Sequence, residues 1–204
     1  MAGADLSGIV VWLVVALGLG VVVVRRRSLA VALVTAQALV LAVSAVHSRG
    51  GAAAALAVRA VALAALFLLV VSRTREPRPV HAGVAPLARA GVAVGFALAL
   101  TWLVPAIGLG SRDVERGVLA LLAFGAVTVA TRRATIFHVL GIVLVENGLA
   151  LAALRLPGGG SSVAIEVGVA VDLTLIALVA MVFHERIFAE FGAGDSAALR
   201  SLRD

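Results

Sequence analysis

Apolar runs close to the length of a membrane-spanning helix follow one another along this 204-residue chain. The chain is 62% hydrophobic, and its mean hydropathy is +1.14. A helix needs about 20 apolar residues to cross the roughly 30 Å hydrocarbon core of a bilayer, and it satisfies its own backbone polar groups there. The sequence therefore predicts an all-α, polytopic integral membrane protein.

Arginine, glycine and proline divide the apolar sequence into seven expected helices. Their spans are roughly 9–24, 29–46, 52–71, 84–107, 118–130, 134–153 and 162–183. The fifth span is the shortest and reaches only about 20 Å at 1.5 Å per residue, so six spans is the alternative. We expect one transmembrane domain over residues 1–204, with four helices in 1–117, three in 118–184 and a tail in 185–204.

The composition excludes several classes of site. The chain has no cysteine, so it holds no iron–sulfur cluster, disulfide or thiolate zinc site. Its 17 basic residues are all arginine, and most lie at the ends of apolar runs, where they anchor helices rather than bind nucleic acid. Glycine and alanine are abundant, which favours close packing of helices. We expect no cofactor, no metal ion and no catalytic centre in this chain.

The arginines also predict the orientation of the chain in the membrane. The odd-numbered loops and the tail hold eleven, namely Arg25, Arg26, Arg27, Arg73, Arg75, Arg78, Arg132, Arg133, Arg186, Arg200 and Arg203. The N-terminal segment and the even-numbered loops hold four, namely Arg49, Arg112, Arg116 and Arg155. Because cytoplasmic loops are enriched in basic residues, we expect the N-terminus outside and the C-terminus in the cytoplasm of a cell with this protein in its inner membrane.

Three carboxylates lie inside the last two apolar runs: Glu146, Glu166 and Asp172. A charged side chain at the centre of a membrane helix costs on the order of 3 kcal/mol, so it usually marks an ion path or a partnered internal site. Counted from the outer helix ends, Glu146 lies about 12 Å deep and Asp172 about 16 Å. The short turn between these two helices predicts antiparallel neighbours, so Glu146 and Asp172 can approach and titrate as a pair.

Four other polar groups lie inside the expected helices, in the second, third and sixth spans. Arg59 is about 12 Å deep and can offset one carboxylate, with Glu146 favoured by depth. The amides of Gln37 and Asn147 can order water between the acids. His138, about 6 Å from the cytoplasmic end of its helix, can lead protons toward Glu146. The predicted proton path therefore comprises Glu146, Asp172, Glu166, Arg59, Gln37, Asn147 and His138.

Each of these residues also has a structural interpretation. Asp172 can be the buried partner of Arg59, and the pair would then brace the bundle. Glu166 lies nearer the outer surface, where a carboxylate can reach the interface or cap a neighbouring helix. A lone membrane histidine such as His138 is as often a packing residue.

Residues 132–203 carry several recognisable features: ENG at 146–148, Pro157, the pattern E-x-G-x-x-x-D from Glu166 to Asp172, and a polar tail. In these features the chain resembles the E membrane subunit of hydrogenase-4 and formate hydrogenlyase-type complexes. More distantly it is similar to the K subunit of respiratory complex I and the C subunit of Mrp cation/proton antiporters. Upstream, Gln37 and the basic Arg59 fall where that family carries glutamine and lysine.

The resemblance implies a NuoK-like arrangement of the last three helices, beside antiporter-like and connecting subunits. The nickel–iron site and the clusters of such a complex reside in other chains. It also implies that Glu146 and Asp172 match the two intramembrane acids of the K-type subunit. We therefore predict a non-catalytic membrane subunit of a complex I-like hydrogenase that contributes carboxylates to proton translocation. A purely structural subunit and a subunit of a multi-subunit cation/proton antiporter are the alternatives.

Overall fold

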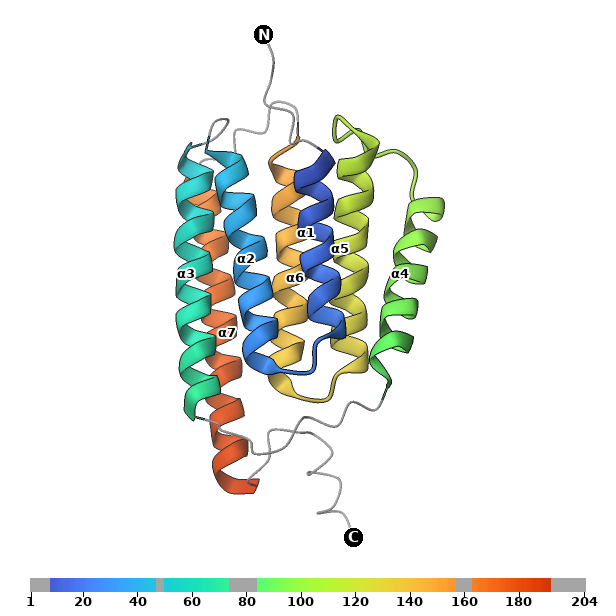
Figure 1. Ribbon diagram of the computed structural model, residues 1–204. Helices are drawn as coiled ribbons and strands as arrows, with labels where there is room; N and C mark the ends of the chain where they lie inside the picture. Colours follow the sequence, from blue (N-terminus) through green and yellow to red (C-terminus); the bar gives the residue numbers. More distant parts are fainter. Residues whose placement is uncertain (1–7, 47–49, 74–83, 157–162, 192–204) are drawn as a thin grey trace.

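The computed structural model describes residues 8–46, 50–73, 84–156 and 163–191. Within these residues the chain is all-helical (Figure 1). The order is α1 (Gly8–Val23), α2 (Arg27–Ala45), α3 (Gly50–Arg73), α4 (Pro86–Leu103), α5 (Arg112–Thr131), α6 (Thr135–Ala153) and α7 (Val163–Phe191). Six of these helices, α2 to α7, are long and apolar enough to cross a membrane. The protein is therefore a multi-pass membrane protein.

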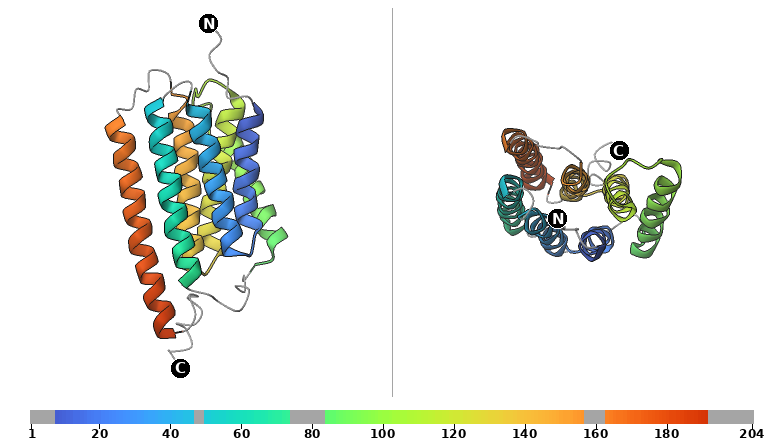
Figure 2. Two further views of the ribbon diagram at one scale, coloured as in Figure 1. Left: turned by 60° about the vertical axis from the view of Figure 1, so that its left-hand side comes forward. Right: turned by 90° about the horizontal axis from the view of Figure 1, so that it is seen from above.

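The helices form two facing rows with α4 at one edge, as the view from above shows (Figure 2). One row is α1, α2 and α3, and the other is α5, α6 and α7. Helix α1 packs on α5, α2 on α6 and α3 on α7, while α4 contacts α5 and α1. Helix α5 is the most buried of the six long apolar helices: 67% of its most apolar 18 residues are buried, against 17% in α4. The outer faces of α3, α4 and α7 are apolar and exposed.

Proline sets both ends of α4. Pro86 lies in the first turn, where a missing N–H costs nothing, and Ala85 before it is extended. Val104 is also extended, as a residue that precedes a proline usually is, and it ends the helix at Leu103. The expected fourth span ran past Pro105 to residue 107 and was therefore too long.

The fifth helix is longer than the sequence predicted. It begins at Arg112 instead of residue 118 and has 20 residues. The Ser111 side chain accepts a hydrogen bond of 3.3 Å from a first-turn amide, and the Glu115 carboxylate accepts one of 2.7 Å from the Gly108 amide. These contacts allow the charged residues 112–116 to form the first turn of the helix. Acidic side chains are stabilised there by the positive end of the helix dipole. The shortest helix is α1, whose 16 residues reach about 24 Å.

The last helix is also longer than expected. Helix α7 continues past residue 183 to Phe191 and extends beyond the other helices (Figure 2). Arg73 at the end of α3 pairs with Glu185 on this extension at 3.7 Å. The expected boundary between helix and tail at residue 185 therefore falls inside a helix.

Glycines let α5 and α6 approach closely. A Cβ atom added at Gly125 would lie 2.6 Å from the carbonyl oxygen of Gly141, and one added at Gly141 would lie 2.9 Å from the carbonyl oxygen of Gly125. Real Cβ atoms do not come this close to backbone oxygen, so a larger residue at either position would push the helices apart. The close packing expected from the small residues is thus present between these two helices.

Candidate functional site

An ion pair between α3 and α6 lies inside the bundle. The Nη1 atom of Arg59 is 3.1 Å from the Oε1 atom of Glu146. Only 3% of the Arg59 side chain is exposed, against 20% of the Glu146 side chain. The pairing expected from the similar depth of the two residues is therefore present.

A line of buried amides continues from this ion pair across the bundle. The Nη2 atom of Arg59 donates to Oδ1 of Asn147 at 2.9 Å, and Nδ2 of Asn147 donates to Oε1 of Gln37 at 2.8 Å. Nε2 of Gln37 then donates to the carbonyl oxygen of Val14 at 2.8 Å. We call this set the polar relay: Glu146, Arg59, Asn147, Gln37 and the carbonyl group of Val14. It joins α3, α6, α2 and α1, and both of its amide side chains are completely buried.

The end of the relay at α1 was not predicted from the sequence. A Cβ atom added at Gly18 would lie 3.0 Å from Nε2 of Gln37 and 2.9 Å from the Leu121 side chain. Gly18 thus leaves the space in which Gln37 reaches the Val14 carbonyl one turn earlier in α1. The one sequence signal for this contact is a glycine in an otherwise apolar run.

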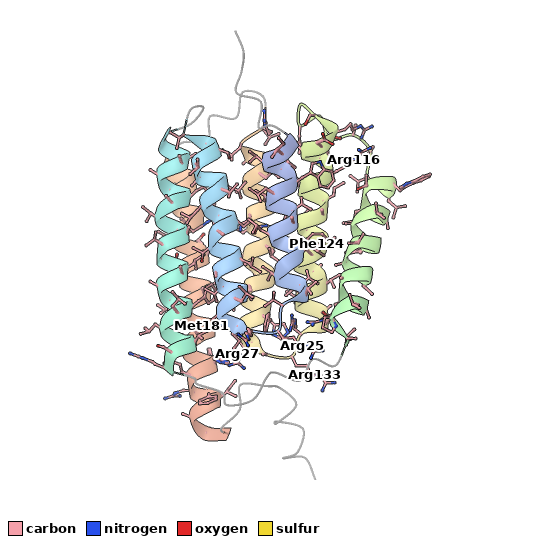
Figure 3. The ribbon with its side chains drawn as sticks, in the orientation of Figure 1. Arg25, Arg27, Arg116, Phe124, Arg133 and Met181 are labelled. Atoms are coloured by element: carbon pink, nitrogen blue, oxygen red, sulfur yellow. The ribbon has the colours of Figure 1, made fainter. Side chains whose placement is uncertain are left out.

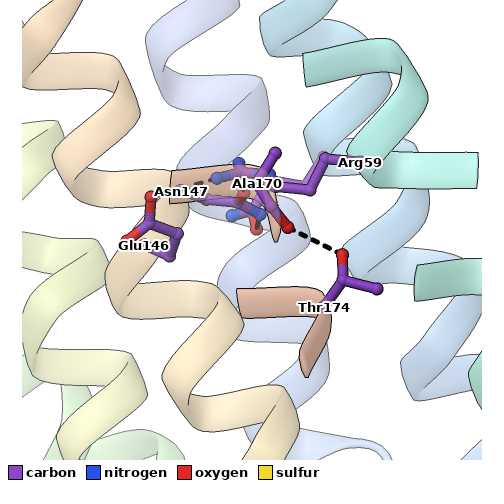
Figure 4. Close-up of polar contacts among 6 residues, drawn as sticks. Arg59, Glu146, Asn147, Ala170 and Thr174 are labelled. Atoms are coloured by element: carbon purple, nitrogen blue, oxygen red, sulfur yellow. Dashed lines mark hydrogen bonds and ion pairs between the residues drawn. The ribbon is translucent and has the colours of Figure 1, made fainter. Parts of the chain in front are cut away.

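A cavity of about 250 Å³ lies beside the ion pair, between α3, α6 and α7. Arg59 and Glu146 line it together with small and aliphatic side chains such as Ala170. The lining is mainly apolar, and Arg59 and Glu146 are its two polar members. Figure 4 shows Arg59 reaching from α3 toward α6, with Ala170 and Thr174 of α7 alongside. The Thr174 hydroxyl is occupied, because it donates to the Ala170 carbonyl at 2.7 Å.

Asp172 of α7 lies apart from this ion pair. Asp172 is exposed on the outer face of α7, where Val171, Leu175 and Ile176 are exposed too. Helix α7 packs more extensively on α3 than on α6, and Asp172 is not among the α7 residues that line the cavity beside Glu146. Within the described ranges, no hydrogen bond or ion pair joins Asp172 to the polar relay. The two acids therefore do not form the direct pair that their depth predicted.

Two other predicted path residues, Glu166 and His138, lie in the first turns of α7 and α6. Glu166 is in the first turn of α7, and its side chain is not among those that the structure describes. His138 is half-buried in the first turn of α6, about 12 Å along the helix from Glu146. Among the residues that are described, no three histidine, aspartate or glutamate side chains lie together as metal ligands would.

No protein-family model, curated protein sequence or solved structure matches this chain. The chemistry of the site therefore follows from its own residues. Glu146 is the carboxylate of the polar relay, and it borders the cavity. Arg59 keeps its charge, because a guanidinium stays protonated in proteins. The amides of Asn147 and Gln37 hold the geometry, since each uses its donor and its acceptor within the relay.

Proposed function

We propose that this chain is a membrane subunit of a complex I-like assembly of the hydrogenase-4 or formate hydrogenlyase type, and that Glu146 takes part in proton translocation. One observation about Glu146 supports the proposal most: its carboxylate pairs with Arg59 and also borders a cavity. An ionisable residue inside membrane helices that faces a partner and a cavity is typical of ion pathways. The family resemblance of residues 132–203 supports the hydrogenase assembly and the NuoK-like last three helices.

The polar relay keeps a positive charge next to Glu146 through a cycle of protonation. When Glu146 binds a proton, it loses the charge that attracts Nη1 of Arg59. Arg59 still donates from Nη2 to Asn147, which is in turn fixed by Gln37. The guanidinium therefore stays beside the acid after the ion pair is broken. Glu146 is the group that changes charge, and Arg59 is a fixed partner.

Asp172 has a different part in this proposal. A charged carboxylate that faced hydrocarbon would cost on the order of 3 kcal/mol. Because Asp172 is exposed on the outer face of α7, we assign it to a contact with a neighbouring membrane subunit, of the antiporter-like or connecting kind. It would then serve a segment of the path that two subunits share.

The arrangement of arginines supports the proposed orientation. Figure 3 shows Arg25, Arg27 and Arg133 at one end of the bundle and Arg116 at the other. We call the end of the bundle that carries Arg25, Arg27 and Arg133 the arginine end. Helix α1 begins at the opposite end, and α7 finishes at the arginine end (Figure 1). With the arginine end in the cytoplasm of the inner membrane, α1 begins outside and α7 finishes inside.

The coupling test replaces Glu146 with glutamine in the assembled complex. Glu146→Gln keeps the size of the side chain and removes the group that titrates, so the number of protons pumped per turnover should fall in the complex that assembles. Proton uptake by vesicles that contain the purified complex is measured alongside its hydrogenase turnover. Glu190→Gln, the same change at an exposed position near the end of α7, should leave pumping unchanged. Full pumping by an intact Glu146→Gln complex would exclude this role.

A bracing subunit is the second candidate, and the four-helix span of the polar relay favours it. Arg59, Asn147 and Gln37 tie α1, α2, α3 and α6 together by hydrogen bonds between 2.8 and 2.9 Å long. A chain that only braces the complex would lose yield on Glu146→Gln, because Arg59 would lose its charged partner. Whatever complex remained would then pump normally, which is the opposite outcome to that expected above.

A further inference from the structure

Arg89 is a buried cation that has no partner among the residues that the structure describes. Its side chain lies on the inner face of α4, in one stripe with Ala93 and Ala97, and this stripe faces the rest of the bundle. Arg89 is completely buried, and its Nε, Nη1 and Nη2 atoms have no hydrogen-bond partner. A guanidinium that is withdrawn from water normally pairs with an acid or binds an anion.

Two other arginines act on Arg89 electrostatically. Arg132, in the turn between α5 and α6, is also buried, and its Nη2 atom donates to the carbonyl oxygens of Val22, at 3.0 Å, and Val24. Its guanidinium lies 4.0 Å above the ring of Phe137. The pKa of Arg132 is lowered to about 10, first by burial and then by repulsion from Arg89 and Arg25. We call Arg25, Arg89 and Arg132 the arginine triad.

The described part of the chain places no carboxylate in an ion pair with the arginine triad. Its carboxylates near the arginine end are Glu185 and Glu190, on α7. Glu185 pairs with Arg73 of α3, and α7 packs against α3 and α6, whereas α4 packs against α5 and α1. Among the described residues, three positive charges therefore act on one another at this end of the bundle without a matching negative charge.

We propose that the arginine triad binds a phosphate group, and that this group belongs to an anionic phospholipid of the cytoplasmic leaflet. Guanidinium groups bind phosphate oxygens with paired, charge-assisted hydrogen bonds. The triad lies at helix ends, which is the level of lipid headgroups, and basic pockets between membrane helices at this level suit anionic lipids. Leu87, two residues before Arg89 and 84% exposed, begins an apolar outer face of α4 along which acyl chains can lie. The exposed Arg25 marks the side from which the headgroup enters.

The experiment uses the full chain in nanodiscs of phosphatidylcholine, with and without phosphatidylglycerol. The midpoint of thermal unfolding is followed by the fluorescence of Trp12 and Trp102, and the phosphatidylglycerol is titrated to obtain its affinity. We expect phosphatidylglycerol to raise the midpoint of the wild-type chain. Arg89→Gln should abolish this rise, and Arg25→Gln should weaken the affinity about fivefold, because one arginine near an anionic lipid contributes about that factor.

Matched variants separate lipid binding from folding. Arg116→Gln removes one exposed arginine at the opposite end of the bundle and should keep the full lipid-dependent rise (Figure 3). Because Arg89 has no partner to lose, Arg89→Gln should be at least as stable as the wild type in pure phosphatidylcholine. Arg25→Gln changes an exposed side chain, so it tests the site even if Arg89→Gln fails to fold.

Three outcomes would overturn the proposal. A full lipid-dependent rise in both Arg89→Gln and Arg25→Gln would show that the triad is not the site. The same rise produced by inorganic phosphate in pure phosphatidylcholine would assign the triad to a free anion instead of a lipid. A loss of complex assembly in Arg25→Gln with an unchanged lipid effect would assign the triad to an acidic residue of a partner subunit.

Discussion

Arg59 is the residue on which the interior of this bundle most depends. It contributes the one charge of the polar relay that cannot be neutralised, and it uses two nitrogen atoms for two partners on α6. Removal of one member of a buried ion pair costs about 3 to 5 kcal/mol, because the other charge is left in a medium of low dielectric. A single substitution at Arg59 therefore tests the ion pair and the amide contact together.

Arg59→Met should destabilise the chain by about 3 to 5 kcal/mol, and combining it with Glu146→Gln should recover much of that loss. Recovery should be incomplete, because the Oδ1 atom of Asn147 still lacks its donor, at a cost of about 1 to 3 kcal/mol. Arg59→Met with Asp172→Asn should be additive, since Asp172 is exposed and does not contact Arg59. The free energy of unfolding is measured for each member of the two double-mutant cycles.

An exposed ion pair provides the control for these cycles. Arg73 is 61% exposed and lies 3.7 Å from Glu185, so Arg73→Met should cost less than about 1 kcal/mol. If Arg59→Met and Glu146→Gln are merely additive, the 3.1 Å contact contributes no coupling energy and Arg59 acts through Asn147 alone.

At the scale of the helices, the glycine contact between α5 and α6 holds the relay in register. Helix α6 carries Glu146 and Asn147, and its distance from α5 is set where Gly125 and Gly141 meet. A larger residue at this crossing would displace α6 and with it both relay residues. The glycines of α4 differ, because a Cβ atom added at Gly91 or Gly95 meets nothing within 4 Å.

Gly125→Ala should therefore lower the free energy of unfolding by about 1 to 3 kcal/mol, the usual cost of overpacking a tight contact. Gly95→Ala should leave it unchanged or raise it by up to about 1 kcal/mol, because alanine favours a helix more than glycine does. The two variants are compared by thermal unfolding in the same lipid. Equal effects of the two substitutions would show that the α5–α6 crossing is not close-packed.

The sequence predicted the order of the seven helices because apolar length is a strong signal, but the ends of some helices depend on other forces. The start of α5 at Arg112 depends on the Ser111 cap and on the hydrogen bond to Glu115. By hydropathy alone, this charged segment is predicted to be a polar loop. Depth along the helices was enough to predict that Arg59 and Glu146 meet. Depth does not predict how a helix is rotated about its axis, and for this reason the position of Asp172 was missed.

At the scale of the whole molecule, the arginine end and the start of α1 lie at opposite ends of the bundle (Figure 1). The turn between α1 and α2 lies at the arginine end, whereas the loop between α4 and α5 lies at the other end (Figure 1). Helices α2, α3 and α4 lie between these two points of the chain. Since an odd number of crossings separates them, the two points must face opposite compartments if each helix spans.

Single cysteines in this cysteine-free chain test that arrangement. Ser28 and Ile107 are both exposed, the first at the start of α2 and the second between α4 and α5. With the arginine end in the cytoplasm, Ile107→Cys should react with a membrane-impermeant maleimide on intact cells, and Ser28→Cys should react only after permeabilisation. The reverse pattern would invert the orientation, and labelling of both from outside would mean that one of α2, α3 and α4 does not cross. An epitope at the N-terminus completes the test for α1, the shortest helix: it should bind antibody on intact cells, and binding only after permeabilisation would leave six spans.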